Sequence, residues 1–172
     1  KRVNDIRRIN KFFEAVNEKL PKGGFFVCFA ETKELRKKRI LAKFPPIINY
    51  LYYTLDFLIK RVFPKFPITK NIYFLLTRGE NRVISRAELL GRLYSCGFEV
   101  LEEEYVDKML FIVARKIKNP AFDLEPTYGP IIKLKRVGRN GNMIKVYKMR
   151  TMHPYAEYLQ SYIFEKHNLQ EG

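Results

Sequence analysis

The sequence has no tryptophan, only two cysteines and no glycine-rich cofactor turn of the GxGxxG or GxGxG kind. Neither Cys28 nor Cys96 has CxxC spacing or a histidine cluster nearby, which excludes a zinc site built from cysteine and histidine. We therefore expect both to be buried free thiols. The missing glycine turn excludes a nucleotide-cofactor loop of that type within these 172 residues.

Acidic residues are scarce, because 18 Asp and Glu stand against 33 Lys and Arg, giving a net charge of +15. Such an excess predicts an anionic partner: nucleic acid, anionic lipid headgroups or a phosphorylated substrate. Charge alone does not choose among these three classes.

The chain also lacks an initiator methionine, since it begins at Lys1, and it ends at Gly172 without any stop signal for a last element. We expect a fragment cut at both ends. The polar stretch around residues 118–127 contains two prolines and predicts a linker. It would join a first unit at residues 1–117, truncated at its N-terminus, to a second at residues 128–172, truncated at its C-terminus.

The first unit has the pattern of alternating helices and strands. Asp5 is expected to cap a helix, and the apolar run at residues 25–30 fits a strand buried on both faces. Ser85 and Glu88 form a capping box for a second helix that stops at Gly97. Two strands are expected at residues 98–104 and 108–114, with a bend near residues 106–107.

This order is similar to the second half of a class I S-adenosylmethionine (SAM) methyltransferase. The strings LPKGGFFVCFAE and LLGRLYSCGFEVLEEEYVDKMLFIVARK carry the resemblance, including a strand that starts with Gly97-Phe98-Glu99-Val100. In that fold the last two strands form the antiparallel end of the sheet. The half that would hold the cofactor turn lies upstream, so SAM binding is not expected here.

Residues 47–63 are mainly apolar or aromatic, interrupted by Asp56 among a few polar positions. A spanning helix needs about 20 mainly apolar residues, and an acid in its middle is costly. Two alternatives remain open: a lid helix packed over the α/β sheet, or a helix lying in an anionic membrane surface with its flanking cations toward the lipid.

Residues 129–152 contain seven Lys or Arg and no acid. Two alternating runs, 131–137 and 143–150, meet around Asn140-Gly141, which is the strongest short-range signal for a β-hairpin. A type I′ turn needs positive φ at both central residues. Gly138, Asn140 and Gly141 are therefore assigned to the geometry of the turn.

Alternation places two matching sets on one face of the hairpin, each apolar at its start and basic at its end. The sets are Ile132, Leu134, Arg136 and Ile144, Val146, Lys148, Arg150. We expect one buried end and one cationic end that binds a phosphate, with Arg136, Arg150 and Lys148 as the candidates. The alternative is that these cations belong to a solvated strand face.

The same string resembles the start of the catalytic domain of bacterial sugar transferases, the membrane-associated phosphoglycosyl transferases that begin surface-polysaccharide synthesis. Their pattern is roughly G-P-x-x-x-K-x-R-V-G-x-x-G-x-x-x-x-x-Y-K-x-R-[ST]-M. This chain has Gly129-Pro130, Arg136-Val137-Gly138, Gly141 and Tyr147-Lys148-Met149-Arg150-Thr151-Met152. The resemblance covers residues 128–172, under a third of the chain.

The resemblance implies transfer of a sugar phosphate from a nucleotide sugar to a polyprenyl phosphate such as undecaprenyl phosphate, in capsule, O-antigen or exopolysaccharide assembly. It also implies Mg²⁺ in the parent protein and a location on the cytoplasmic, inner face of the bacterial inner membrane. The family's catalytic pair is an adjacent Asp-Glu downstream of this motif. No Asp-Glu dipeptide occurs here, so we expect no catalytic residue and no activity in this fragment.

The chain departs from the family pattern before Gly129. Members carry a membrane-embedded hydrophobic hairpin or re-entrant helix there, whereas residues 116–128 are short and polar. Membrane contact would then come from residues 47–63.

Together these features predict an α/β fold: the C-terminal half of a Rossmann-like methyltransferase sheet with an antiparallel end, then a β-hairpin and helix from a truncated sugar-transferase domain. Two other functions remain open: a SAM-dependent methyltransferase, or a non-enzymatic basic module that binds a membrane surface or nucleic acid. Nucleic acid is the least favoured, because most aromatic residues fall at positions with core-like periodicity.

Overall fold

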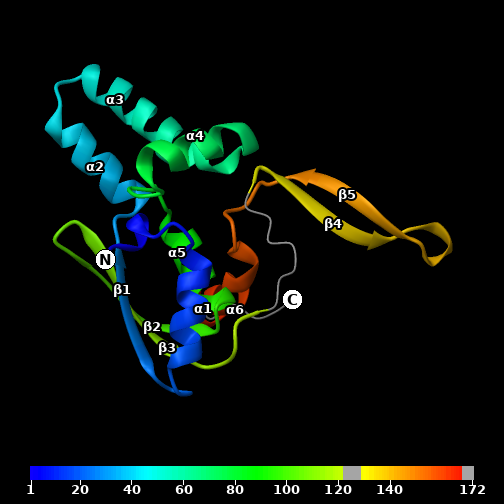
Figure 1. Cartoon of the computed structure of the whole chain (residues 1–172). Coiled ribbons are helices and arrows are strands. Elements are labelled where there is room, and N and C mark those ends of the chain that lie inside the picture. The colour runs from blue at the N-terminus through cyan, green and yellow to red at the C-terminus, as the bar shows by residue number, and fades with distance from the viewer. Residues whose placement is uncertain (122–128, 168–172) are drawn as a thin grey trace.

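The computed structural model describes residues 1–121 and 129–167, and within them the chain is a mixed α/β structure with two antiparallel sheets (Figure 1). The helices are α1 Ile9–Lys19, α2 Lys33–Lys43, α3 Ile48–Phe57, α4 Pro67–Thr77, α5 Arg86–Ser95 and α6 Gln160–His167. The strands are β1 Phe25–Ala30, β2 Phe98–Val106, β3 Met109–Lys116, β4 Ile131–Val137 and β5 Met143–Met149.

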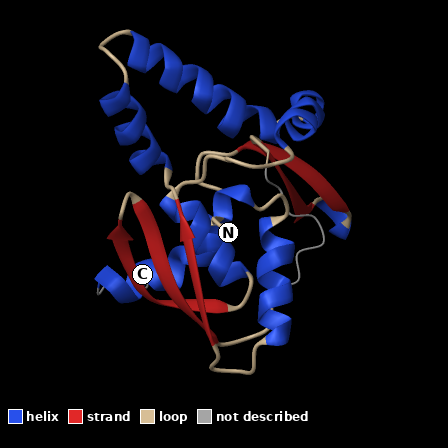
Figure 2. Cartoon of the chain, turned by 60° about the vertical axis from the view of Figure 1, so that its left-hand side comes forward, coloured by secondary structure: helices blue, strands red, loops and turns tan. Residues whose placement is uncertain are grey.

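The first sheet has the order β1-β3-β2, with β3 antiparallel to both neighbours (Figure 2). All three strands lie where the sequence predicts them, and β2 turns into β3 at Asp107-Lys108, where both φ angles are positive. The expectation that β1 is buried on both faces is wrong, because Phe25 and Val27 are 63% and 59% exposed. In the described part of the chain, β1 ends the strand order and helices cover only its inner face.

The core lies between this sheet and the helices α1 and α5. Phe13 of α1 and Leu93 of α5 are fully buried against Ile112 of the central strand. Both cysteines belong to this core and are free, as predicted. Burial raises the pKa of Cys28 to about 12 and that of Cys96 to about 11, so both thiols stay protonated.

The two predicted helix starts have different outcomes. Ser85 caps α5 by accepting a hydrogen bond from the Glu88 amide at 3.3 Å, and Gly97 has φ +83° behind the helix, as predicted. The cap by Asp5 is wrong. Asp5 lies in a separate 3₁₀ turn, where its carboxylate binds Arg2 and the Asn81 amide, and α1 begins later, at Ile9.

Helix α3 packs on α2 through charged side chains. The Arg36 guanidinium donates two hydrogen bonds to the Asp56 carboxylate, at 2.6 and 2.9 Å, and both side chains are almost fully buried. Asn49 and Asp56 are the buried residues of α3, while its apolar side chains face outward. The lid alternative is therefore wrong, because the apolar side of α3 does not pack against the sheet.

The hairpin β4–β5 projects away from the rest of the chain (Figure 1). Its register pairs Leu134 with Val146, so the predicted sets do share one face. Asn140 and Gly141 have φ of 61° and 76°, as the Asn-Gly signal predicts. The connection is longer than a two-residue turn, since it spans residues 138–142 and closes with a 2.7 Å bond from the Gly138 amide to the Asn142 carbonyl.

The C-terminal segment packs on α5. Leu159 lies in a 3₁₀ turn at Ala156–Leu159, is buried and joins the core of the first unit, and Tyr162 of α6 packs against that core. Gly91 lets the Tyr155 backbone lie close to α5, because a Cβ at this position would be 2.4 Å from the Tyr155 carbonyl oxygen. The predicted linker falls partly on residues 122–128, outside the described residues, and the division into two units stays a prediction.

Replacing Gly91 with alanine should destabilise the chain by about 1–3 kcal/mol, because the added methyl group collides with the Tyr155 backbone. Helix propensity alone favours alanine by roughly 0.5–1 kcal/mol, so the sign of the change separates the two effects. Urea unfolding measures it. Gly129→Ala is the matched control, because among the described residues its Cβ would meet only the Lys65 carbonyl oxygen, at 3.7 Å. Equal stability of the Gly91 variant and the wild type would contradict the close packing.

Candidate anion-binding pocket

The antiparallel register separates Arg136 from the other two candidate phosphate ligands, Lys148 and Arg150. Arg136 lies opposite Ile144 near the outer loop, whereas Lys148 lies opposite Ile132 near the base of the hairpin. Four residues along a strand correspond to about 13 Å. The expectation of one basic end and one apolar end is therefore wrong, because the two sets run in opposite directions along the hairpin.

Arg150 is the candidate that reaches the rest of the molecule. Its amide donates to the Pro130 carbonyl at 2.7 Å, and its Nε donates to the Gly129 carbonyl at 3.1 Å. These two bonds hold Arg150 against Gly129 and Pro130, the first two residues of the basic motif at residues 129–152.

A pocket of about 300 Å³ lies at this point, and four cationic side chains from separate segments line it. Lys33 comes from the start of α2, Arg61 from a π-helical turn at Leu58–Val62, Lys65 from a 3₁₀ turn at Phe63–Lys65, and Arg150 from the end of the basic motif. Phe57, Gly129, Pro130, Thr151, Met152, His153 and Pro154 complete the lining. Among these described lining residues four are cationic and none is acidic, although Lys33 and Arg61 pair with Glu34 and Glu88 outside the lining.

Glu88 of α5 holds Arg61 in place from behind the pocket. It forms ion pairs with Arg61 and Arg92, and all three side chains are buried. Burial alone would raise the pKa of Glu88, but the two guanidinium groups outweigh it and lower the pKa to about 2. Arg61 also donates to the Val83 carbonyl at 2.9 Å, which fixes its orientation.

Lys65 is half-buried beside other cations. Burial, together with the positive charges of Arg61 and Arg150, lowers the pKa of Lys65 to about 8. A bound anion would reverse this shift, because it favours the charged form of the ammonium group. The lowered pKa of Lys65 therefore reflects its burial next to other cations.

His153 has a local role at the rim. Its Nδ1 lies 3.3 Å from the Ser85 hydroxyl, which also caps α5. This contact joins the rim of the pocket to the start of α5.

Sequence reasoning missed Lys33, Arg61 and Lys65 as pocket residues. For Arg61 and Lys65 the signal was the basic flank of residues 60–65, which one of the two open alternatives for residues 47–63 turned toward lipid. Glu103 of β2 pairs with Arg86, and its carboxylate accepts a hydrogen bond from the Tyr162 hydroxyl at 3.1 Å.

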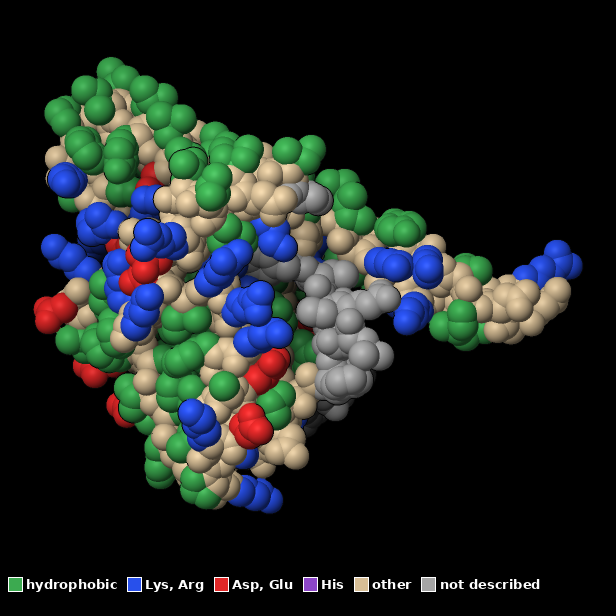
Figure 3. Space-filling view, viewed as in Figure 1, with side chains coloured by type: hydrophobic (Ala, Val, Ile, Leu, Met, Phe, Trp, Pro, Cys, Tyr) green, Lys and Arg blue, Asp and Glu red, His purple; other side chains and the backbone are tan. Residues whose placement is uncertain are grey.

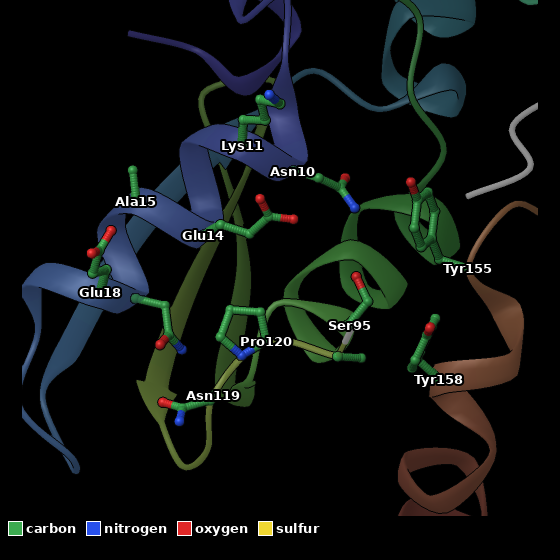
Figure 4. A pocket seen from close by; sticks show the side chains of 12 residues that line it. Asn10, Lys11, Glu14, Ala15, Glu18, Ser95, Asn119, Pro120, Tyr155 and Tyr158 are labelled. Atoms are coloured by element: carbon green, nitrogen blue, oxygen red, sulfur yellow. The ribbon is translucent and has the colours of Figure 1, made fainter. Parts of the chain in front are cut away.

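A larger pocket of about 760 Å³ lies between α1, α5 and the C-terminal segment (Figure 4). Asn10 and Glu14 from α1, Ser95 from α5 and Tyr155 are among the side chains that line it. Its charged residues are Lys11, Glu14 and Glu18, so it lacks the cationic excess of the smaller pocket.

The described residues do not fit the Mg²⁺ that the sequence resemblance implies. Within residues 1–121 and 129–167, no three His, Cys, Asp or Glu side chains gather as a metal site. The pocket itself is lined by cations, which repel a divalent metal ion.

Comparison with protein-family models, with curated proteins and with solved structures gives no match. In the described part of the chain, no helix combines the length and the apolar character that crossing a membrane requires.

Glu88→Gln should lower the stability by roughly 3 kcal/mol at neutral pH, because it removes the charge of the carboxylate that pairs with two buried guanidinium groups. The pKa of Glu88 is lower in the folded than in the unfolded chain. Its contribution is therefore complete above about pH 4.5 and is lost as the pH falls toward 2. Urea unfolding at several pH values should show the two proteins converging in acid.

Glu99→Gln is the matched control, since its partner Arg115 lies at 2.7 Å but both side chains are partly exposed. We expect a loss below about 1 kcal/mol there. Equal losses for Glu88 and Glu99 would contradict the structural role of the buried pair.

Proposed function

We propose that the chain is part of a phosphoglycosyl transferase that moves a sugar phosphate from a nucleotide sugar to a polyprenyl phosphate at a membrane surface, in surface-polysaccharide synthesis. One observation carries this proposal. Arg150, from the motif shared with bacterial sugar transferases, lines one pocket with Lys33, Arg61 and Lys65.

The chemistry needs such a pocket. Transfer breaks the bond between the bridging oxygen of the diphosphate and the phosphorus of the sugar phosphate. A nucleoside monophosphate leaves, and the carrier phosphate gains a diphosphate link to the sugar. Both substrates are anions, so positioned cations must offset their repulsion and stabilise the charge on the phosphoryl oxygens.

The roles of the side chains follow from their positions. Arg61 is oriented by Glu88 and the Val83 carbonyl, which suits it to a fixed contact with phosphate oxygens. Lys65 is a more adaptable point charge, and an anion would raise its lowered pKa. Arg136 and Lys148 stay candidates for phosphate contact along the projecting hairpin, at separate places.

These residues support binding rather than turnover. The 172 residues contain no adjacent Asp-Glu pair, and the described residues do not fit a divalent metal. We therefore expect the chain to bind the substrate phosphate without transferring it.

For residues 1–117 we propose the second half of a Rossmann-like methyltransferase sheet. The antiparallel pair β2–β3 and the start of β2 after Gly97 support this assignment. SAM binding is not part of the proposal, because no glycine-rich cofactor turn occurs in the sequence.

Lys65→Met should weaken binding of UDP-glucose and of inorganic pyrophosphate about tenfold or more, because a charge-assisted hydrogen bond is lost. Isothermal titration calorimetry at fixed ionic strength measures this change. The wild-type affinity should also fall between about pH 7 and pH 9, as Lys65 loses its proton near pH 8, whereas the variant should show a flatter profile.

Lys22→Met removes the same charge from an exposed position outside the pocket and serves as the control. It should leave both affinities within about twofold of wild type, because a distant exposed charge is screened by salt. If neither ligand gives a heat of binding with the wild type, the proposed binding of phosphate in the pocket is wrong.

A further inference from the structure

Helix α4 carries its apolar side chains on its outer surface. Ile68, Ile72, Leu75 and Leu76 follow the i, i+4, i+7, i+8 spacing of one helix stripe, and Leu75 and Leu76 are 82% and 76% exposed. Tyr73 lies on the opposite side, buried, with its hydroxyl donating to the Glu80 carbonyl at 2.8 Å. The stripe that usually faces a core therefore faces outward in α4.

Helix α3 is inverted in the same way. Leu51 and Leu55 lie on its outer face, more than half exposed, while Asn49 and Asp56 face α2. The Asn49 amide donates to the Leu41 carbonyl at 3.1 Å, and Asp56 is held by Arg36. Polar contacts thus fasten the helix, and its apolar side is left uncovered.

The two stripes form one surface, which we call the apolar crest. It contains thirteen large apolar side chains that are each at least 40% exposed: Ile47, Ile48, Tyr50, Leu51, Tyr52, Leu55, Leu58, Ile59, Phe66, Ile68, Ile72, Leu75 and Leu76. Figure 3 shows hydrophobic side chains gathered along the α3–α4 edge of the molecule. Monomeric soluble proteins rarely expose contiguous apolar patches larger than a few hundred Å². Patches of this kind mark interaction sites, so we expect the crest to bind a partner.

Charge identifies the partner. Between residues 47 and 77 the sequence has one acid, Asp56, whose side chain is buried in its ion pairs, and four bases, Lys60, Arg61, Lys65 and Lys70. Helix α2 adds the exposed Lys37, Lys38 and Lys43 against one exposed acid, Glu34, and Figure 3 shows cations directly below the hydrophobic edge. An apolar layer backed by cations, with its acid turned inward, matches the acyl and headgroup layers of an anionic bilayer.

We propose that the apolar crest docks on the surface of an anionic lipid bilayer. Helices α3 and α4 lie along the interface, with their apolar stripes toward the acyl chains and the cations of α2 toward the headgroups. Their ten and eleven residues are too short to span, so the contact is peripheral. This proposal goes beyond the phosphate pocket and does not depend on the ligand that the pocket binds.

Sedimentation with vesicles tests the docking. The wild-type chain should pellet with vesicles of phosphatidylcholine and phosphatidylglycerol, more weakly with phosphatidylcholine alone, and less when salt is raised. The double variant Leu75→Asp, Leu76→Asp should lower the partition coefficient about tenfold or more, because it removes two leucines from the buried layer and adds repelling charge.

Val27→Asp is the matched control, since Val27 is also exposed but lies on β1, outside the crest. It should bind vesicles as the wild type does. Wild-type chain that pellets with neither vesicle, or a double variant that binds like wild type, would overturn the proposal.

Sedimentation velocity without vesicles tests the alternative that a second copy of the chain covers the crest. A wild-type dimer that the double variant converts to monomer would assign the crest to contact between copies and also overturn the proposal. Titration of the double variant with UDP-glucose keeps the two proposals apart, because loss of vesicle binding should leave the pocket's affinity unchanged.

Discussion

The placement of α3 on α2 depends on the buried ion pair between Arg36 and Asp56. Removing one partner of such a pair costs several kcal/mol, because the other charge stays buried without compensation. Helix α3 therefore cannot turn its apolar stripe inward without breaking the two short bonds that fasten it to α2. The same orientation carries the chain onward to Arg61 and Lys65, which face the end of the basic motif.

A second buried charge cluster supports the pocket. Glu88 neutralises part of the positive charge of Arg61 and Arg92 inside the core, whereas Lys65 and Arg150 line the opening. Glu88 thus compensates buried positive charge behind the pocket, while separate segments bring Lys65 and Arg150 to its lining. The segment from Phe57 to Lys65 belongs to both the pocket lining and the edge of the crest, which brings the proposed anion site and the proposed bilayer contact together.

Local signals in the sequence were reliable where one short segment decides the outcome. Ser85 and Gly97 marked both ends of α5, and Asn140-Gly141 marked the hairpin, because capping and positive φ are properties of a few neighbouring residues. The errors came from partners distant in sequence. Asp5 binds the Asn81 amide instead of capping a helix, and the outer face of β1 lacks a cover among the described elements.

The sequence by itself determined the α/β character, the strands, the hairpin and the excess of positive charge, since these follow from periodicity, turn chemistry and composition. Only the tertiary structure decided which cations meet. Antiparallel pairing carried Arg136 away from Arg150, and the packing of α2, α3 and α5 brought Lys33, Arg61 and Lys65 to it. The physical reason is that periodicity defines a face of an element, whereas long-range ion pairs and register determine what that face meets.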